Sequence, residues 1–393
     1  MQLPNYKNGS IVNLMQSILQ SYDSKKNRSN TVSDYKQLQE LPAEEITQAK
    51  NVIFLIVDGF GYEYLQRYGK KSIFAEHLRG KITSVFPSTT AAAITTLNTG
   101  VAPQQHGLTG WYMYLREIGI VTAILPFTPR IGGVAFSRTN VDPRKIFTQQ
   151  SIFEKIHVAK YIITANNIIN SDYSVTLASK AKRIGYNTLN QFFSAMKKTV
   201  SINTRKKFIY AYWPYFDSLC HHYGTQDKKN VYHHFQQLDK KMKKLVADLQ
   251  GSNTMIIITA DHGLINTTEK KAIFVDEHPE FKKMLALPLT GERRAAYCYV
   301  RAGKEKAFEQ YVHKHFSKQC WLFKSTELVQ KNWYGLGMMH DKLLDRIGDY
   351  VLVMKENYVI LDELLGEERS FHLGTHGGVS KEEMFVPLIV IKC

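Results

Sequence analysis

The sequence predicts an α/β protein with a three-layer α/β/α core around a mostly parallel central sheet. Three apolar runs support this prediction: "NVIFLIVDG" at 51–59, "KKFIYAYWPYFD" at 206–217 and "NTMIIITADHG" at 253–263. Runs that are apolar on both faces are typical of central strands in a parallel sheet. Between the last two runs, apolar residues spaced by four and three from Val231 to Leu249 predict a helix with one buried stripe. Strand, helix and strand in this order favour a right-handed βαβ unit.

The remaining elements are predicted along the chain from the same kinds of pattern. Residues 11–20 have helical periodicity and a polar linker follows them at 21–30, whereas 385–393 form a strand-like run near the end. The stretch 280–340 has its own strand–helix–strand pattern, and we expect 131–205 to form a second insertion or cap. The predicted organisation is an N-terminal helical extension and linker over 1–45, an α/β core over 46–279 and 341–393, and an inserted α+β subdomain over 280–340.

Composition favours a globular protein with anionic partners. Apolar residues make up 44% and charged residues 22%, and 51 Lys and Arg against 35 Asp and Glu give a net charge of +16. Such an excess attracts phosphate esters, nucleotides, nucleic acid or acidic lipid without choosing among them. The basic residues lie in short runs with no nucleic-acid motif. A non-catalytic binder of nucleic acid or anionic membrane is the alternative that these charges leave open.

The cellular location is predicted from what the sequence lacks. Its four cysteines show no pairing pattern, which is typical of free thiols in a reducing compartment. The N-terminus has no basic and apolar signal pattern. No apolar run approaches the roughly 20 residues that span a bilayer. We therefore expect a soluble, cytoplasmic protein without a transmembrane segment; its oligomeric state is not readable from the sequence.

The stretch "VFPSTTAAAITTLNTG" at 85–100 places three hydroxyl side chains directly before an alanine-rich run. Ser and Thr cap helix N-termini, and a helix N-terminus also attracts phosphate. We expect Ser88 or Thr89 to cap a helix that Gly100 ends, which leaves Thr90 for chemistry.

Polar residues collect where the predicted strands end or loops begin. They are Asp58, Asp217, His221, Asp261, His262 and His376. Ligand-binding residues of open α/β sheets lie just beyond the carboxyl ends of the strands. The four-residue spacing from Asp217 to His221 would put both side chains on one face of a helical turn. Carboxylates and imidazoles together suit Zn²⁺ or a similar divalent ion, and the size of the set predicts two ions.

Six motifs then occur in a characteristic order. They are "VDGFG" at 57–61, "FPSTTAAAITTLNTG" at 86–100, "HGLTGW" at 106–111, "DSLCHHYG" at 217–224, "ADHG" at 260–263 and "THGG" at 375–378. From about residue 50 to its end, the chain resembles the alkaline phosphatase superfamily and, within it, the type I phosphodiesterase/nucleotide pyrophosphatase branch. This resemblance implies an alkaline-phosphatase-like fold and a metal-dependent hydrolase of small anionic phosphate esters.

The resemblance also assigns roles to residues of this sequence. It implies that Thr90 is the nucleophile and passes through a phosphothreonine intermediate, with two divalent ions and Zn²⁺ as the expected metal. The residues implied for one zinc are Asp58, Thr90, Asp261 and His262, and those for the other are Asp217, His221 and His376. A phosphomonoesterase or a head-group phosphotransferase on the same fold stays open as an alternative.

Two positions depart from the nucleotide-cleaving members of the family. Ala91 stands where an aromatic residue follows the nucleophile and stacks on the base, and Trp111 stands where an asparagine holds a phosphoryl oxygen. Whether the substrate is a nucleotide therefore stays open. We expect Trp111 and Tyr112 to line the substrate pocket. Arg293 and Arg294 are expected either to bind an anionic part of the substrate or to form surface salt bridges.

Overall fold

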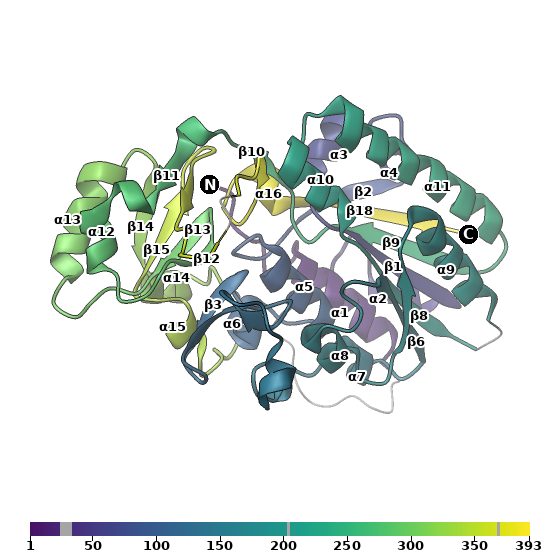
Figure 1. The fold of residues 1–393 in the computed structure, drawn as a ribbon. Coiled ribbons are helices and arrows are strands. Elements are labelled where there is room, and N and C mark those ends of the chain that lie inside the picture. The colour runs from purple at the N-terminus through teal and green to yellow at the C-terminus, as the bar shows by residue number, and fades with distance from the viewer. Residues whose placement is uncertain (24–33, 203–204, 368–369) are drawn as a thin grey trace.

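The computed structural model describes residues 1–23, 34–202, 205–367 and 370–393, so most of the predicted polar linker at 21–30 lies outside the described residues. A seven-stranded sheet in the order β2-β18-β9-β1-β8-β6-β7 forms the centre of the larger part of the molecule (Figure 1). Its strands are β1 (Asn51–Val57), β2 (Leu78–Thr83), β6 (Ala159–Ala165), β7 (Lys182–Tyr186), β8 (Lys207–Trp213), β9 (Thr254–Thr259) and β18 (Phe385–Lys392). The neighbours β9, β1, β8, β6 and β7 run parallel, and β18 is antiparallel to both β9 and β2. The prediction of a mostly parallel central sheet is confirmed.

The three apolar runs form the middle of this sheet. Every residue of β1, β8 and β9 is buried, and β1 lies between the other two with Asn51 opposite both Lys207 and Thr254. Helix α11 (His233–Leu249) connects β8 to β9 and buries the apolar stripe that its spacing predicted. Because both faces of these strands are covered, no alternation of polar and apolar residues is needed in their sequences.

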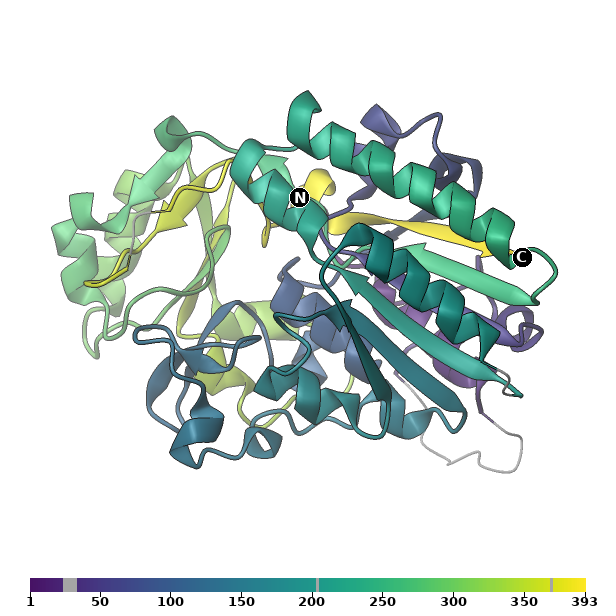
Figure 2. The same ribbon diagram turned by 45° about the vertical axis from the view of Figure 1, so that its right-hand side comes forward.

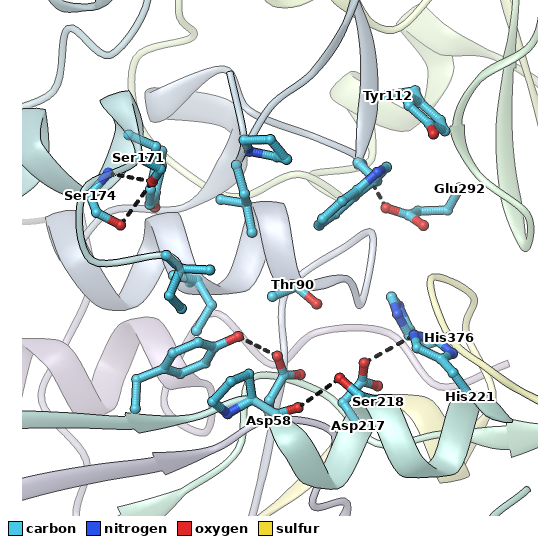
Figure 3. Close-up of a pocket in the computed structure, with 18 of the residues that line it drawn as sticks. Asp58, Thr90, Tyr112, Ser171, Ser174, Asp217, Ser218, His221, Glu292 and His376 are labelled. Atoms are coloured by element: carbon cyan, nitrogen blue, oxygen red, sulfur yellow. Dashed lines mark hydrogen bonds and ion pairs between the residues drawn. The ribbon is translucent and has the colours of Figure 1, made fainter. Parts of the chain in front are cut away.

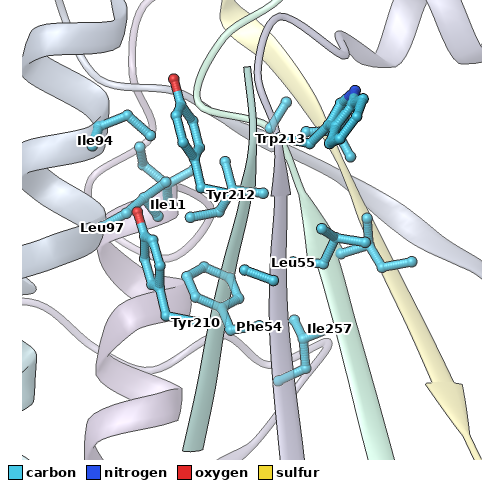
Figure 4. Close-up of a cluster of buried hydrophobic side chains, with 14 of the residues drawn as sticks. Ile11, Phe54, Leu55, Ile94, Leu97, Tyr210, Tyr212, Trp213 and Ile257 are labelled. Atoms are coloured by element: carbon cyan, nitrogen blue, oxygen red, sulfur yellow. The ribbon is translucent and has the colours of Figure 1, made fainter. Parts of the chain in front are cut away.

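Helices cover both faces of the main sheet, which gives the expected three layers (Figures 1 and 2). On one face lie α3 (Tyr62–Tyr68), α4 (Ile73–Glu76), α9 (Leu189–Ser201), α10 (Tyr215–Tyr223) and α11. On the other lie α1 (Ile11–Ser21), α2 (Ala43–Thr47), α5 (Thr90–Thr99), α7 (Ile152–Lys155) and α8 (Asp172–Ala178). Ile11 of α1 and Leu97 of α5 meet Phe54 and Tyr210 of the sheet in one apolar cluster (Figure 4). The predicted N-terminal helix is thus a layer of the core.

Part of the region expected to be a second insertion or cap belongs to the main sheet instead. Residues 159–186 supply β6, α8 and β7, which extend the sheet beyond β8. The expectation was wrong because β7 is an edge strand. Four of its five residues are not buried, so it lacks the continuous apolar run that marked the central strands.

A second seven-stranded sheet, in the order β14-β15-β13-β12-β3-β4-β5, lies beside the first (Figure 1). Its strands are β3 (Tyr112–Leu115), β4 (Ile120–Ala123), β5 (Thr128–Pro129), β12 (Thr290–Glu292), β13 (Ala295–Cys298), β14 (Cys320–Lys324) and β15 (Tyr350–Met354). The predicted strand, helix and strand are confirmed as β13, α13 (Glu305–Phe316) and β14. The sheet also takes strands from outside 280–340, and the subdomain boundaries stay a prediction.

Smaller elements complete the structure. They are α6 (Pro103–His106), α12 (Pro279–Met284), α14 (Ser325–Gln330), α15 (Leu343–Arg346), α16 (Lys381–Met384), β10 (Ile265–Asn266) paired with β17 (Gly374–Thr375), and β11 (Ala272–Phe274) paired with β16 (Val359–Leu361). Among the described residues, none of the helices combines the length and apolar character needed to cross a membrane. The cytoplasmic location stays a prediction.

A buried ion pair connects the two sheets. Arg294, in the turn between β12 and β13, donates from Nε and Nη2 to the two carboxylate oxygens of Glu383, each at 2.8 Å. Glu383 lies in α16 beside β18, and its Oε1 also accepts from the amide of Gly378 at 2.8 Å. Burial alone raises the pKa of Glu383, but the Arg294 guanidinium outweighs burial and lowers it. Of the two roles expected for Arg294, the salt bridge is confirmed, although it is buried and not on the surface.

We predict that Arg294→Met lowers the free energy of unfolding by about 3–5 kcal/mol, because it leaves the Glu383 carboxylate buried without its partner. Urea denaturation at pH 7 measures the loss. The control is Lys283→Met, which breaks an exposed pair with Glu280 and should cost far less. Equal losses in both variants would contradict the prediction.

The ion pair between Arg294 and Glu383 also predicts how the free energy of unfolding changes with pH. Because the pKa of Glu383 is lowered in the folded state, its contribution to stability is complete above the unfolded Glu pKa of about 4.3 and is lost as pH falls below that value. The stability difference between wild type and Arg294→Met should therefore shrink on acidification below about pH 4.

Candidate metal centre and active site

A cavity of about 860 Å³ lies beyond the carboxyl ends of β1 and β8 and reaches the second sheet. Its wall takes side chains from the main sheet, from α5 and α8, and from the β12–β13 turn (Figure 3). Seven of the predicted site residues line it: Asp58, Thr90, Trp111, Tyr112, Asp217, His221 and His376. Asp261 and His262 are fully buried beneath this wall.

The parallel strands β1 and β9 bring two carboxylates together. Asp58 directly follows β1, and Asp261 follows β9 by two residues, so the two meet at the same edge of the sheet. Asp261 Oδ1 accepts from the amide of Gly59 at 3.1 Å. Gly59 has φ +71°, and a Cβ atom there would lie 2.7 Å from Leu264. Only glycine allows the chain to turn this closely around the carboxylates.

Asp217 and His221 lie one turn apart on α10. His221 Nε2 is 3.0 Å from Asp217 Oδ2, which confirms that the four-residue spacing places them on one helix face. Asp217 is not at a strand end, however. Strand β8 stops at Trp213, and Pro214 ends the ladder because it has no amide to donate. With His221 Nδ1 donating to the carbonyl of Gly374 at 2.7 Å, the imidazole is oriented with Nε2 toward Asp217.

Thr90 is the first residue of α5, and its Oγ1 is 3.0 Å from His262 Nε2. Thr89 occupies the N-cap position, but no side chain caps the helix amides. The hydroxyl of Thr89 donates to Glu292 Oε1 and that of Ser88 donates to the carbonyl of Gly378, so the expected side-chain cap was wrong. Uncapped amides keep the positive end of α5 available to an anion.

Gly100 ends α5 in the left-handed conformation with φ +77°, as the sequence predicts. The helix therefore has the predicted bounds, although its start is held by contacts with the loops around it and not by its own cap.

His376 completes the cluster from the loop after β17. Its ring stacks on that of His262 with centroids 3.8 Å apart, and it lies 5.1 Å from the ring of His221. The potential ligand atoms form two groups, each within 4.8 Å: Asp58, Asp261 and His262, and Asp217, His262 and His376. The structure thus brings together all seven residues that the resemblance assigned to metal binding.

The cluster fits a bound cation. Four of its buried atoms have no hydrogen-bond partner among the described residues: Asp58 Oδ1, Asp217 Oδ1, Asp261 Oδ2 and His376 Nδ1. Leaving such atoms unsatisfied is costly, and a divalent cation coordinated by them removes that cost. Carboxylate oxygens and imidazole nitrogens are ligands that Zn²⁺ accepts.

Electrostatics also favours a cation. Burial and the charges of Asp261 and Asp217 raise the pKa of Asp58, and burial raises the pKa of Asp261. Burial acts in the same direction on Asp217, but the histidines around it, with His221 first among them, together lower the pKa of that carboxyl. Three carboxylates in one buried place repel each other, and a divalent ion would relieve this repulsion.

Glu292 is a site residue that the sequence did not reveal. Besides the hydroxyl of Thr89, its Oε1 accepts from the amide of Trp111 at 2.7 Å, and burial raises its pKa. It lies on β12, about 200 residues from Thr89, in a stretch with no motif. Only the pairing of β12 with β3 signals its position, because that pairing sets Gly291 opposite Tyr112.

Trp111 and Tyr112 both line the cavity wall. The Tyr112 ring lies 4.7 Å from the guanidinium of Arg130, which fixes its position. Tyr212 of β8, another residue that the sequence did not single out, donates from its hydroxyl to Asp58 Oδ2. Three aromatic side chains, Trp111, Tyr112 and Tyr212, thus line the cavity, and Tyr212 contacts the carboxylate of Asp58.

A hydroxyl at a helix start, facing buried Asp and His residues at the edge of a mostly parallel sheet, defines an alkaline-phosphatase-like hydrolase. The chain belongs to the type I phosphodiesterase/nucleotide pyrophosphatase family, whose model matches residues 52–379. This is a family of metal-dependent phosphoester hydrolases.

Three relatives illustrate the similarity. Human ectonucleotide pyrophosphatase/phosphodiesterase family member 5 is 23% identical over 343 residues, which make up 84% of this chain and 66% of that protein, so the chain spans just under two thirds of its length. The murine protein of that name superimposes with a TM-score of 0.66 at 18% identity, over 86% of this chain and 87% of that one. Phosphonoacetate hydrolase from Sinorhizobium meliloti 1021, in complex with phosphonoacetate, gives 0.65 at 17% identity over 87% and 90%. At such identities the solved structures show the shared fold.

We predict that the protein binds about two equivalents of Zn²⁺ and that His221→Ala binds about one, because His221 serves only one side of the cluster. Elemental analysis after dialysis against limiting zinc measures the ratio. His222→Ala is the matched control, because this adjacent exposed histidine packs on Tyr223 outside the cluster and should leave loading unchanged. Equal loading in all three proteins would contradict the assignment.

Proposed function

We propose that the protein hydrolyses phosphoric esters, with Thr90 as the nucleophile, two divalent metal ions as cofactors and zinc as the metal. The observation that carries the proposal is the position of Thr90. Its hydroxyl lies in the cavity wall, at the start of α5 and 3.0 Å from His262. The structure of the murine relative in complex with AMP is that of an inactive threonine-to-alanine variant, which supports both a threonine nucleophile and a small phosphate ester as substrate.

The residues proposed to hold the metals are those that the resemblance implies: Asp58, Thr90, Asp261 and His262 for one ion, and Asp217, His221 and His376 for the other. The structure supports this division in part, because Asp58, Asp261 and His262 form one group of potential ligands, Thr90 lies 3.0 Å from His262, and His221 lies 3.0 Å from Asp217, but His262 is also grouped with Asp217 and His376. When bound, such ions favour the deprotonated form of the nucleophile and of water and stabilise charge on phosphoryl oxygens. The cluster supports this assignment because its buried oxygens otherwise lack partners.

The chain's own groups supply the rest of the reaction. Thr90 Oγ1 attacks phosphorus, the ester oxygen leaves, and phosphothreonine forms; water then cleaves the phosphothreonine and restores the hydroxyl. The uncapped amides of α5 can hold a phosphoryl oxygen during both steps. Glu292 positions Thr90 indirectly, because it ties the preceding Thr89 and the amide of Trp111 to one carboxylate.

The cavity favours a diester over a monoester. It extends from Thr90 in two directions, toward Ser171 and Ser174 on one side and toward Tyr112 and Glu292 on the other (Figure 3). A phosphoryl group at Thr90 therefore has space for a substituent on each side. We propose that Trp111 and Tyr112 line the substrate pocket, since both lie in this wall.

We predict that Thr90→Ala lowers kcat/KM for bis(p-nitrophenyl) phosphate by at least about a thousandfold, because the attacking oxygen is lost. Release of p-nitrophenolate measures the rate. Thr99→Ala, at the other end of α5, should keep wild-type turnover, since its hydroxyl only donates to the carbonyl of Thr95. Wild-type turnover in Thr90→Ala would refute the mechanism.

The same assay separates the proposal from its alternatives. A diesterase turns over bis(p-nitrophenyl) phosphate faster than p-nitrophenyl phosphate, whereas a phosphomonoesterase has the reverse preference with the same leaving group. A non-catalytic binder hydrolyses neither.

We predict that exhaustive chelation abolishes hydrolysis and that added Zn²⁺ restores it, because the carboxylates and imidazoles around Thr90 would then regain their ion. The measurement pairs turnover with elemental analysis of the same sample. Thr90→Ala should retain most of its metal, which separates the nucleophile from the ligands. Full activity in protein shown to be free of metal would exclude a metal-dependent reaction.

A further inference from the structure

The turn between β12 and β13 places Arg293 at the cavity wall on a fixed backbone. The residue before it, Glu292, is held by Thr89 and Trp111, and the residue after it, Arg294, is held in the buried ion pair. The carbonyl of Arg293 itself accepts from the amide of Ile360 at 2.9 Å. The backbone at Arg293 is therefore held in place by the contacts of Glu292, of Arg294 and of its own carbonyl.

Three arginines line the cavity, and two of them hold parts of its wall together. Arg130 forms a two-point ion pair with Glu367 at 2.7 and 2.8 Å. Arg183 donates to the carbonyl of Ile169 at 2.6 Å and to a neighbouring asparagine. Both guanidinium groups therefore serve to hold the wall together.

The guanidinium of Arg293 is held less tightly than the other two. It donates from Nη2 to the hydroxyl of Ser370 at 3.1 Å, which is a neutral partner. Burial lowers its pKa, with Glu292 and Glu363 as the nearest opposing charges. Arg293 is half-buried in the cavity wall, and an anion entering the cavity would gain a charge-assisted interaction with its guanidinium.

We propose that Arg293 binds a second anionic group of the substrate, a carboxylate or a phosphate, while the phosphoryl group reacts at Thr90. The guanidinium offers planar paired donors that match the oxygens of either group. Arg293, Thr90 and His221 line the same cavity, so one small molecule bound there can contact Arg293 at one end and Thr90 at the other. This inference rests on the proposed function and narrows its substrate class to esters with two anionic groups.

The test compares two diesters with the same leaving group, ethyl p-nitrophenyl phosphate and 2-carboxyethyl p-nitrophenyl phosphate. Wild type should prefer the carboxylate diester by about tenfold to a hundredfold in kcat/KM, the range for one charge-assisted interaction. In Arg293→Met the ratio should fall to near 1, mainly through a higher KM for the carboxylate diester. Arg301→Met, which removes an exposed arginine whose side chain donates to the carbonyl of Lys283, is the matched control and should keep the wild-type ratio.

A binding measurement keeps the inference testable without turnover. Calorimetry on the zinc-loaded protein should show 2-carboxyethylphosphonate binding about tenfold or more tightly than propylphosphonate, and Arg293→Met should lose this difference. Thermal unfolding and metal content confirm that the variant is folded and loaded. If neither diester is hydrolysed but the binding difference holds, the proposed function fails and the anion site stands. If both diesters are hydrolysed with the same ratio in wild type and Arg293→Met, the role of Arg293 is refuted.

Discussion

Repulsion among three buried carboxylates is the constraint on which the rest of this structure depends. Asp58 and Asp261 meet because β1 and β9 are parallel neighbours, and Asp217 reaches them from the first turn of α10. Burial favours the protonated form of Asp58, and His262 and His376 place imidazole nitrogens within the same two groups of potential ligands. A cation would satisfy the oxygens that lack partners among the described residues, and its binding would then be coupled to the fold. The hydroxyl of Thr90 lies beside this cluster, 3.0 Å from His262 Nε2, so under the proposed mechanism its reactivity depends on the same cation.

The second sheet holds the reactive loop in place as well as closing the cavity. In three consecutive residues, Glu292 fixes the start of α5, Arg293 faces the cavity and Arg294 ties the turn to Glu383. Glu383 in turn holds the amide of Gly378, two residues from His376, so the same ion pair steadies the loop that carries a residue of the cluster. The Arg293 side chain is thus positioned by the hydrogen bonds of Glu292 and by the ion pair of Arg294.

Much of this arrangement could be predicted from the sequence. The buried central strands, α11 and the bounds of α5 carry strong local patterns, and Asp58, Asp261 and His262 could be found as polar residues that follow apolar strands. Glu292 and Tyr212 could not, because their importance comes from which distant loop or strand lies opposite. The capping role of Thr89 was misread for the same reason: a carboxylate from another sheet takes its hydroxyl. Strand β7 was missed because the polar residues of an edge strand dilute its apolar pattern. Strand β6 lies inside the sheet, but only its last five residues are buried, so its apolar run is shorter than those of β1 and β8.

Ala91 and Trp111 show how such a site can change its substrate while keeping its chemistry. Ala91 is fully buried against the core and presents no ring to the cavity, so a base cannot stack there as it does beside an aromatic residue. Trp111 uses its backbone amide to hold Glu292, and its side chain lines the wall. Neither residue is among the potential ligands, so the chemistry at Thr90 is untouched by either. Under the proposed function, selectivity comes from other parts of the cavity, where Arg293 offers a charge that the aromatic wall does not. Recognition of a second anion would then replace recognition of a base and leave the residues around Thr90 in place.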